Sequence, residues 1–316
     1  MVDYLGFGVL LALLLLCAWL TWQARRLRNR AARWAGAGLA GLLTLALALL
    51  FGAAAYGAAQ LGRSYPNPTA QLTVARTPER IARGQRLANA CAGCHASGGQ
   101  LPLTGRDFTE GGPPVGTLYA ANLTPGGELG SWSDGEVIRA IREGIHRDGR
   151  SLLIMPSQNF RNLSDDDVQA LVAFLRSQPP APPTPPTRIN LMGALIVTLS
   201  GGAILSAQPP LAGPVVAPPP GPTAAYGQYL AASVGGCAEC HGPNLVGRTG
   251  GGNGPPGGPA LTTLARRWSE AEFVQAIRTG KRPDGSALGE EMPWQQISAL
   301  ASDDDLRALY AYLATL

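Results

Sequence analysis

The pentapeptide CAGCH at Cys91–His95 and its counterpart CAECH at Cys237–His241 decide what kind of molecule this sequence makes. Both read C-x-x-C-H, a pattern typical of covalent haem attachment. Two residues between the cysteines let one helical turn present both sulfurs to a single porphyrin edge, where they form thioether bonds, and the adjacent histidine reaches the iron. We therefore predict two covalently bound haem c groups, each with a histidine as its proximal ligand.

Three other chemistries use paired cysteines. Two C-x-x-C pairs can build one tetrahedral zinc site, but this leaves both histidines unexplained. A thioredoxin-like redox pair requires a preceding strand, whereas the flanks here are helical and rich in glycine, and a disulfide explains neither histidine. We therefore expect four cysteines to bind haem covalently and two histidines to ligate iron: Cys91, Cys94, Cys237, Cys240, His95 and His241.

Length and charge bound the remaining possibilities. The 316 residues are enough for two or three compact units. Only 6% of them are aromatic, so we expect each porphyrin to form much of its hydrophobic centre. The net charge of +4 comes from a cluster of arginines between residues 25 and 33, because residues 34–316 hold 20 basic and 20 acidic side chains. This balance excludes the basic patch that nucleic-acid binding needs.

Two apolar runs precede the first motif. Tyr4–Trp22 is long enough to cross a hydrocarbon core of about 30 Å, and Trp34–Leu61 is long enough to cross it with tilt. The first run lacks the basic region that starts a signal peptide, since it begins with Asp3. We therefore predict a two-helix membrane anchor over residues 1–62, with the lipid bilayer as a partner.

Small residues recur along the second apolar run. The pairs Ala37/Gly41 and Ala53/Gly57 have the small-xxx-small spacing that permits close helix packing in lipid. Two uses fit this spacing: packing onto the first helix, or docking into a larger membrane complex.

The first motif lies in a unit that the sequence then repeats. A helix over Glu79–Ala90 leads into the motif, and a capping box at Ser133–Glu136 opens a second helix. Met155 is followed by a proline, and Ser164 caps a last helix whose first turn holds three aspartates. Acidic side chains in that turn are favoured by the helix dipole.

The second motif is surrounded by the same sequence of features. The leading helix is expected at Tyr226–Ala232, the capping box at Ser269–Glu272, and the methionine followed by proline is Met292. Ser302 and three aspartates open the final helix. The chain therefore contains an internal duplication.

A glycine-rich loop suited to wrapping a haem follows each motif, at residues 98–116 and 242–258. Arg106 and Arg248 each follow a glycine in these loops. Both are candidates to pair with a haem propionate.

Each copy resembles a class I cytochrome c domain, over roughly 79–180 and 223–316. In addition, the run Asn122–Pro125 followed by Gly130–Asp134 resembles cytochrome subunits of periplasmic alcohol, aldehyde and gluconate dehydrogenases. The resemblance implies an all-α fold in which an N-terminal transmembrane helical hairpin precedes two tandem class I cytochrome c domains. The expected parts are an anchor (1–62), a linker (63–78), domain 1 (79–180), a Pro-rich and apolar interdomain segment (181–222) and domain 2 (223–316).

Met155 and Met292 are the expected distal ligands of the two irons, because both match the family's ligand position and precede a proline. Thioether ligation raises the reduction potential. Met192 lies in the interdomain segment, where apolar filling is expected. His146 is an alternative to Met155 that would lower the potential, but Arg282 occupies the equivalent place in the second copy, which favours a surface or propionate-contacting role for His146.

Topology follows from the arginine cluster. Basic loops stay cytoplasmic, so the loop at 25–33 places both termini and both haem domains on the periplasmic side of a bacterial inner membrane, with two transmembrane helices. The haem motifs indicate the same side, because covalent attachment resembles the extracytoplasmic maturation of bacterial c-type cytochromes.

The apolar segment Ile189–Ala207 is expected not to span the membrane. One further crossing would place the second haem domain in the cytoplasm, and Asn190 and Ser200 weaken the run. It lies on the membrane surface, or packs against a haem domain or a partner.

These features predict a membrane-bound dihaem cytochrome c without catalytic activity of its own. It carries single electrons between a membrane oxidoreductase complex and another redox partner on the periplasmic side, and the protein sets potential, exposure and docking. The partner is an oxidase, a quinol oxidoreductase, a reaction centre or a dehydrogenase. One alternative is a cytochrome subunit that accepts electrons from a periplasmic alcohol, aldehyde or sugar dehydrogenase. Another is a dihaem peroxidase, which a methionine at both irons opposes.

Overall fold

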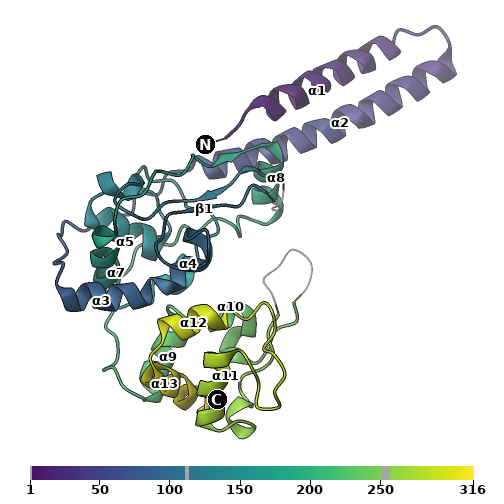
Figure 1. The fold of residues 1–316 in the computed structure, drawn as a ribbon. Coiled ribbons are helices and arrows are strands. Elements are labelled where there is room, and N and C mark those ends of the chain that lie inside the picture. The colour runs from purple at the N-terminus through teal and green to yellow at the C-terminus, as the bar shows by residue number, and fades with distance from the viewer. Residues whose placement is uncertain (1, 111–113, 251–256) are drawn as a thin grey trace.

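A computed structural model describes residues 2–110, 114–250 and 257–316. The two gaps fall in the glycine-rich loops expected to wrap the haems, so those parts of the loops lie outside the described residues. The fold is mostly helical, as predicted, and has three parts (Figure 1): a long helical hairpin, a first domain beside its base, and a second domain below the first.

The hairpin consists of α1 (Leu5–Ala24) and α2 (Arg30–Leu61). The helices of the first domain are α3 (Pro78–Leu87), α4 (Asn89–His95), α5 (Asp134–Glu143), α6 (Ser157–Phe160) and α7 (Asp165–Ser177), followed by α8 (Leu191–Leu199). Those of the second domain are α9 (Ala224–Ala232), α10 (Cys237–His241), α11 (Glu270–Thr279), α12 (Trp294–Leu300) and α13 (Asp303–Leu313). Short strands β1 (Arg106–Asp107), β2 (Gly116–Thr117), β3 (Tyr119–Ala120) and β4 (Arg188–Ile189) form the antiparallel pairs β1–β3 and β2–β4.

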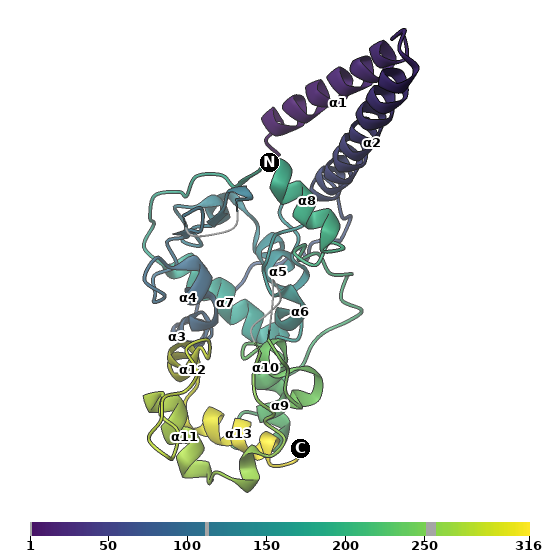
Figure 2. The same cartoon turned by 90° about the vertical axis from the view of Figure 1, so that its right-hand side faces the viewer.

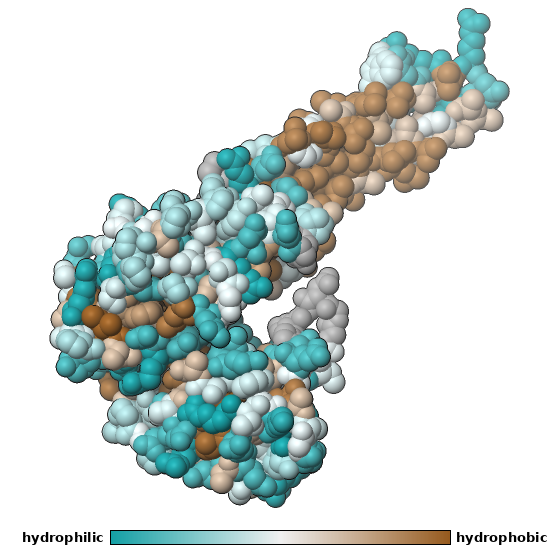
Figure 3. All heavy atoms as spheres, viewed as in Figure 1, coloured by the Kyte–Doolittle hydropathy of each residue, from teal (hydrophilic) through white to brown (hydrophobic). Residues whose placement is uncertain are grey.

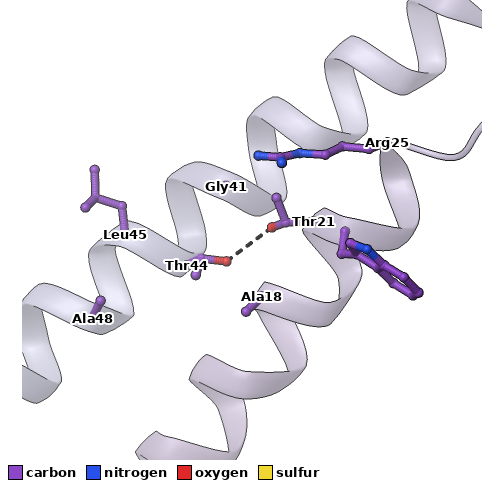
Figure 4. Close-up of a pocket in the computed structure, with 8 residues that line it drawn as sticks. Ala18, Thr21, Arg25, Gly41, Thr44, Leu45 and Ala48 are labelled. Atoms are coloured by element: carbon purple, nitrogen blue, oxygen red, sulfur yellow. Dashed lines mark hydrogen bonds between the residues drawn. The ribbon is translucent and has the colours of Figure 1, made fainter.

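Both hairpin helices are long and apolar enough to cross a membrane. The second begins at Arg30 rather than at Trp34, because the Asn29 side chain accepts a hydrogen bond from a backbone N–H of the first turn. The helices meet where the Thr21 and Thr44 hydroxyl oxygens lie 3.2 Å apart, beside Gly41 (Figure 4). The small residues of α2 at this level therefore serve packing onto α1.

The other small-residue pair of α2 contacts α8. Any Cβ at Gly57 would overlap the carbonyl oxygen of Ala194, and the Thr198 hydroxyl donates to the carbonyl of Ala53 at 2.6 Å. Only a helix of nine residues forms in the apolar interdomain segment, which is too short to cross a bilayer. The helix of this segment, α8, instead packs between the first domain and the hairpin.

Each domain is built around one close helix crossing. In domain 1, Gly84 of α3 meets the carbonyl oxygen of Ala170 in α7, and in domain 2, Gly227 of α9 meets that of Ala308 in α13. A Cβ at either glycine would overlap the opposite backbone. The duplication predicted from sequence is therefore also a duplication of backbone packing.

The expected helix caps are present. The Ser133–Glu136 and Ser269–Glu272 capping boxes both form. The Ser164 side chain accepts from the backbone N–H of Asp167, and Ser302 accepts from that of Asp305. These caps fix where the second and last helices of each domain begin.

The segment expected as a linker lies against domain 1. The Asn67 side chain donates to Glu143 at 2.5 Å and is buried. The Val74 N–H donates to Asp134 at 2.8 Å, and the Val74 side chain is buried. Hydrogen bonds to domain 1 therefore hold this segment in place at Asn67 and Val74.

The two domains share one interface. A buried carboxylate, Asp167 of α7, receives hydrogen bonds from the Arg83 guanidinium and, at 2.6 Å, from the hydroxyl of Tyr229 in domain 2. The Tyr229 oxygen also accepts from the Ser164 N–H at 3.0 Å. Burial raises the pKa of Tyr229, and the neighbouring carboxylate raises it further. The apolar core of domain 1 continues across this contact into α9 and α12.

Candidate functional site

Each C-x-x-C-H motif forms a short helix of its own, α4 or α10. The predicted helix over Glu79–Ala90 is wrong in its extent, because α3 ends at Leu87 and α4 begins at Asn89. The Asn89 side chain donates to the carbonyls of Gln85 and Arg86. These hydrogen bonds occupy carbonyl acceptors in the last turn of α3, and the helix that carries the motif, α4, begins at the same residue.

The cysteines are not arranged for thiol redox chemistry. Burial raises the pKa of the Cys91 thiol to about 12 and that of Cys237 to about 11. Redox-active cysteines have lowered pKa values. Both pairs also follow a helix, whereas a thioredoxin-like pair follows a strand.

The two motif histidines are held in the same way. His95 Nδ1 lies 2.8 Å from the carbonyl oxygen of Ala121, and His241 Nδ1 lies 2.7 Å from that of Pro259. A hydrogen bond from one ring nitrogen to a backbone carbonyl fixes the tautomer and leaves the other nitrogen for a metal. Burial lowers the pKa of His95, which favours the neutral ring that iron ligation requires.

The two loop arginines contact the attachment helices. The Arg106 guanidinium donates to the carbonyl of Gly93 at 3.0 Å, and Arg248 donates to that of Glu239 at the same distance. Gly93 and Glu239 are equivalent residues, each just before the second cysteine of its motif. The arginines thus tie each glycine-rich loop back to its attachment helix, a contact other than the expected propionate pairing.

The methionines followed by proline lie with the cysteines in each core. Met155 and Cys91 are half-buried against the cluster of domain 1, and Met292 and Cys237 against that of domain 2. Met192, by contrast, is 47% exposed on α8. Paired cysteines, a held histidine and an apolar methionine therefore occur together twice, and this residue set fits a haem.

His146 has both ring nitrogens engaged. Its Nε2 lies 3.0 Å from a Glu128 carboxylate oxygen and its Nδ1 lies 2.8 Å from one of Asp148. The Trp132 and His146 rings pack at right angles, with ring centroids 4.7 Å apart. The hydrogen bond to His146 lowers the pKa of Glu128. These contacts support an ordinary structural role for His146 rather than replacement of Met155.

The two attachment helices meet the opposite domain reciprocally (Figure 2). Helix α4 packs against α12, which follows Met292, and Asn89 donates to the Ala299 carbonyl. Helix α10 lies beside α6, which follows Met155, and Gln158 and Asn159 both donate to Glu239 at 2.7 Å. Each helix that carries a C-x-x-C-H motif therefore contacts, in the other domain, the helix that follows the predicted ligand methionine.

Sequence reasoning did not identify Asn159 or Glu239 as interface residues. The available signal was Glu239 itself, an acidic residue inside an attachment motif whose counterpart is Gly93. Sequence reasoning also missed Arg142, which donates to Asp165 at 2.6 Å, and Arg278, which donates to Asp303 at 2.7 Å. These two arginines sit at equal places in the repeat, two residues before a helix-ending glycine.

The zinc alternative lacks support in the described part of the chain. The two cysteine pairs lie on separate helices, α4 and α10. Within residues 2–110, 114–250 and 257–316, no three His, Cys, Asp or Glu side chains gather as a metal site.

Comparison with known proteins matches both copies of the repeat. A family model described as cytochrome c matches residues 81–179. A second model, described as cytochrome C oxidase, cbb3-type, subunit III, matches residues 222–313.

Three relatives illustrate the wider similarity. A subunit of the nicotinate dehydrogenase of Pseudomonas putida is 35% identical over 75% of this chain and 21% of its own length. The cytochrome c subunit of alcohol dehydrogenase (quinone) of Gluconobacter oxydans is 29% identical over 75% of this chain and 54% of its own. The gluconate 2-dehydrogenase cytochrome c subunit of Pantoea cypripedii is 28% identical over 75% and 59%. The chain thus spans between a fifth and three fifths of the length of these relatives.

Proposed function

We propose that this chain, which carries two cytochrome c domains, is the electron-transferring subunit of a membrane-bound dehydrogenase. Such domains imply covalently bound haem c, and we infer two groups, one on each C-x-x-C-H motif. The chain takes single electrons from a substrate-oxidising partner and passes them to a second redox partner on the periplasmic side. The similarity to alcohol and gluconate dehydrogenase subunits supports this choice of electron donor.

The observation that carries the proposal is the reciprocal contact of α4 with α12 and of α10 with α6. Two attachment helices that each meet the ligand-methionine side of the other domain bring the two cofactor sites to one interface. Electrons therefore enter at one domain and leave at the other without a free intermediate carrier.

Within each domain, the proposed cofactor residues have separate roles in attaching the haem and in ligating its iron. Each bound haem supplies an iron that takes up and releases one electron. Cys91 and Cys94 would hold the first haem, with His95 as proximal and Met155 as distal ligand. The Ala121 carbonyl orients the His95 ring, and Met155 packs against the apolar cluster of domain 1. The second set is Cys237, Cys240, His241 and Met292.

The proposed topology places the arginine-rich loop between α1 and α2 in the cytoplasm. Arg25, Arg26 and Arg28 are exposed at this tip of the hairpin, and basic loops stay cytoplasmic. Both haem domains then stand on the periplasmic side.

The partner is tested by gentle extraction of the chain from native membranes, with mass identification of the proteins that remain bound. Recovery of a periplasmic dehydrogenase supports the proposal. Recovery of a terminal oxidase, a quinol oxidoreductase or a reaction centre, without a dehydrogenase, would refute the choice of donor.

The ligands are tested by redox titration of the purified full-length holoprotein. Met292→Leu removes a thioether that favours reduced iron, so the potential of one haem falls while the other stays nearly unchanged. Met192→Leu, the same change on α8, leaves both potentials unaltered. A shift of both haems in Met292→Leu would contradict separate sites.

A further inference from the structure

Aromatic side chains mark two levels on the hairpin. Trp22 and Trp34 are 48% and 75% exposed near the arginine-rich tip, and Tyr4 and Tyr56 are 67% and 59% exposed toward the haem domains. Trp and Tyr gather at membrane–water interfaces. From residue 34 to residue 56, α2 rises about 33 Å at 1.5 Å per residue, which matches a hydrocarbon core of about 30 Å. Figure 3 shows the apolar surface of the hairpin between these ends.

Helix α8 touches the hairpin at the level of the two tyrosines. Leu191, at its start, lies against Gly6, two residues beyond Tyr4. Near its end, the Thr198 hydroxyl donates to Ala53, three residues before Tyr56. Both ends of α8 thus meet the hairpin at the same level, so that the helix crosses it along the expected plane of the interface.

One face of α8 is apolar and uncovered. Met192, Ile196 and Leu199 follow the i, i+4, i+7 spacing of a single helix face, and Met192 and Leu199 are 47% and 81% exposed. The rest of the helix is buried at Gly193, Ala194, Leu195 and Val197. Ala194 meets Gly57 of the hairpin, and Gly193 meets Val115 of domain 1. The sequence contains no charged residue from 189 to 238.

We propose that α8 is an interfacial helix that inserts Met192 and Leu199 into the lipid of the periplasmic leaflet. Leu191, the neighbour of Met192, lies against Gly6, and the adjacent Leu5 of the hairpin is 77% exposed. An uncharged apolar face at that level would have lipid as its neighbour. The first domain is then held on the membrane by the hairpin and by direct contact with lipid. The inference rests on the proposed topology, in which the hairpin spans the bilayer.

The test uses the full-length holoprotein in vesicles of phosphatidylcholine and phosphatidylglycerol, in a Cys17→Ser background. A nitroxide label is attached at Leu199→Cys, and its collisions with oxygen, which enters lipid, and with a nickel chelate, which stays in water, are measured by electron paramagnetic resonance. Val216→Cys is the matched control, because Val216 is equally exposed, at 82%, and its neighbour Val215 accepts a hydrogen bond from the Asp165 N–H of α7 in domain 1. Leu43→Cys on α2 reports the spanning helix.

We expect the oxygen-to-nickel collision ratio at position 199 to be higher than at 216 and lower than at 43, because position 43 lies deeper in the hydrocarbon core than the interface. A label at Met192→Cys, on the same face, should agree. A ratio at 199 equal to that at 216 would overturn the inference while leaving the hairpin in place. Protection from both reagents would also overturn it, because a protein then covers the face. A water-like ratio at 43 would refute the spanning hairpin as well.

Discussion

The hydroxyl of Tyr229 makes a buried polar contact across the domain interface. It donates to the Asp167 carboxylate at 2.6 Å, accepts from the Ser164 N–H at 3.0 Å, and the Asp167 side chain is only 1% exposed. A hydrogen bond to a charged group contributes about 1.5–3 kcal/mol. Because about 1.4 kcal/mol is a factor of ten, Tyr229→Phe should raise the undocked fraction of the two domains roughly 10- to 100-fold.

Hydrogen exchange followed by mass spectrometry on the holoprotein measures the undocked fraction of the two domains. Exchange in α12 should accelerate, although α12 is not in contact with the changed hydroxyl, because opening of the interface also separates α12 from α4. The control is Tyr310→Phe, which removes a 2.8 Å hydrogen bond to the Trp268 carbonyl within domain 2. It should accelerate exchange in α13 without affecting α4. Unchanged exchange of α12 in Tyr229→Phe would refute the view that the domains dock as one unit.

Two further predictions concern single side chains. Gly84→Ala should lower the unfolding free energy of the holoprotein by about 1–3 kcal/mol, because the new Cβ overlaps the α7 backbone. Scanning calorimetry measures this loss. The control is Gly38→Ala, which should show no such loss because its Cβ meets nothing within 4 Å. The pKa of Glu128 is lowered by its hydrogen bond with His146, so its contribution to stability is full above its ordinary value and is lost as pH falls through the lowered one. Acid unfolding followed by circular dichroism should therefore show a smaller stability loss on acidification for Glu128→Gln than for the unmodified chain. Glu290→Gln, at an exposed position, should follow the unmodified chain. Equal curves for Glu128→Gln and the unmodified chain would contradict the stabilising hydrogen bond between Glu128 and His146.

Features set by short stretches of sequence were predictable. The attachment motifs, the capping boxes at Ser133 and Ser269, and the two apolar helices all depend on residues close together in the chain, and the structure has each of them. The helical cytochrome c character of both copies followed from the order of these local signals.

Features that join distant residues were not predictable. The spacing of Ala53 and Gly57 indicated close helix packing. The residues of α2 alone did not indicate that the neighbour would be α8, some 140 residues later in the sequence. Residues 63–78 were expected as a linker. The hydrogen bonds that hold this segment, from Asn67 to Glu143 and from Val74 to Asp134, depend on side chains of α5, which is distant in the sequence. Reciprocal packing of the attachment helices is likewise a property of the docked domains.

The fastening of domain 1 to the hairpin limits where its haem site can go. A free 16-residue linker would have a root-mean-square reach of roughly 20–24 Å and let the domain search for a partner. Here the Asp3 N–H donates to the Ile189 carbonyl at 2.7 Å, and α8 contacts both hairpin helices. Domain 1 therefore does not move freely relative to the hairpin, and the proposed electron donor would have to place its redox centre at one fixed height above the membrane. A domain held in this way suits a long-lived complex with its partner, in which the rate of electron transfer does not depend on repeated diffusional association.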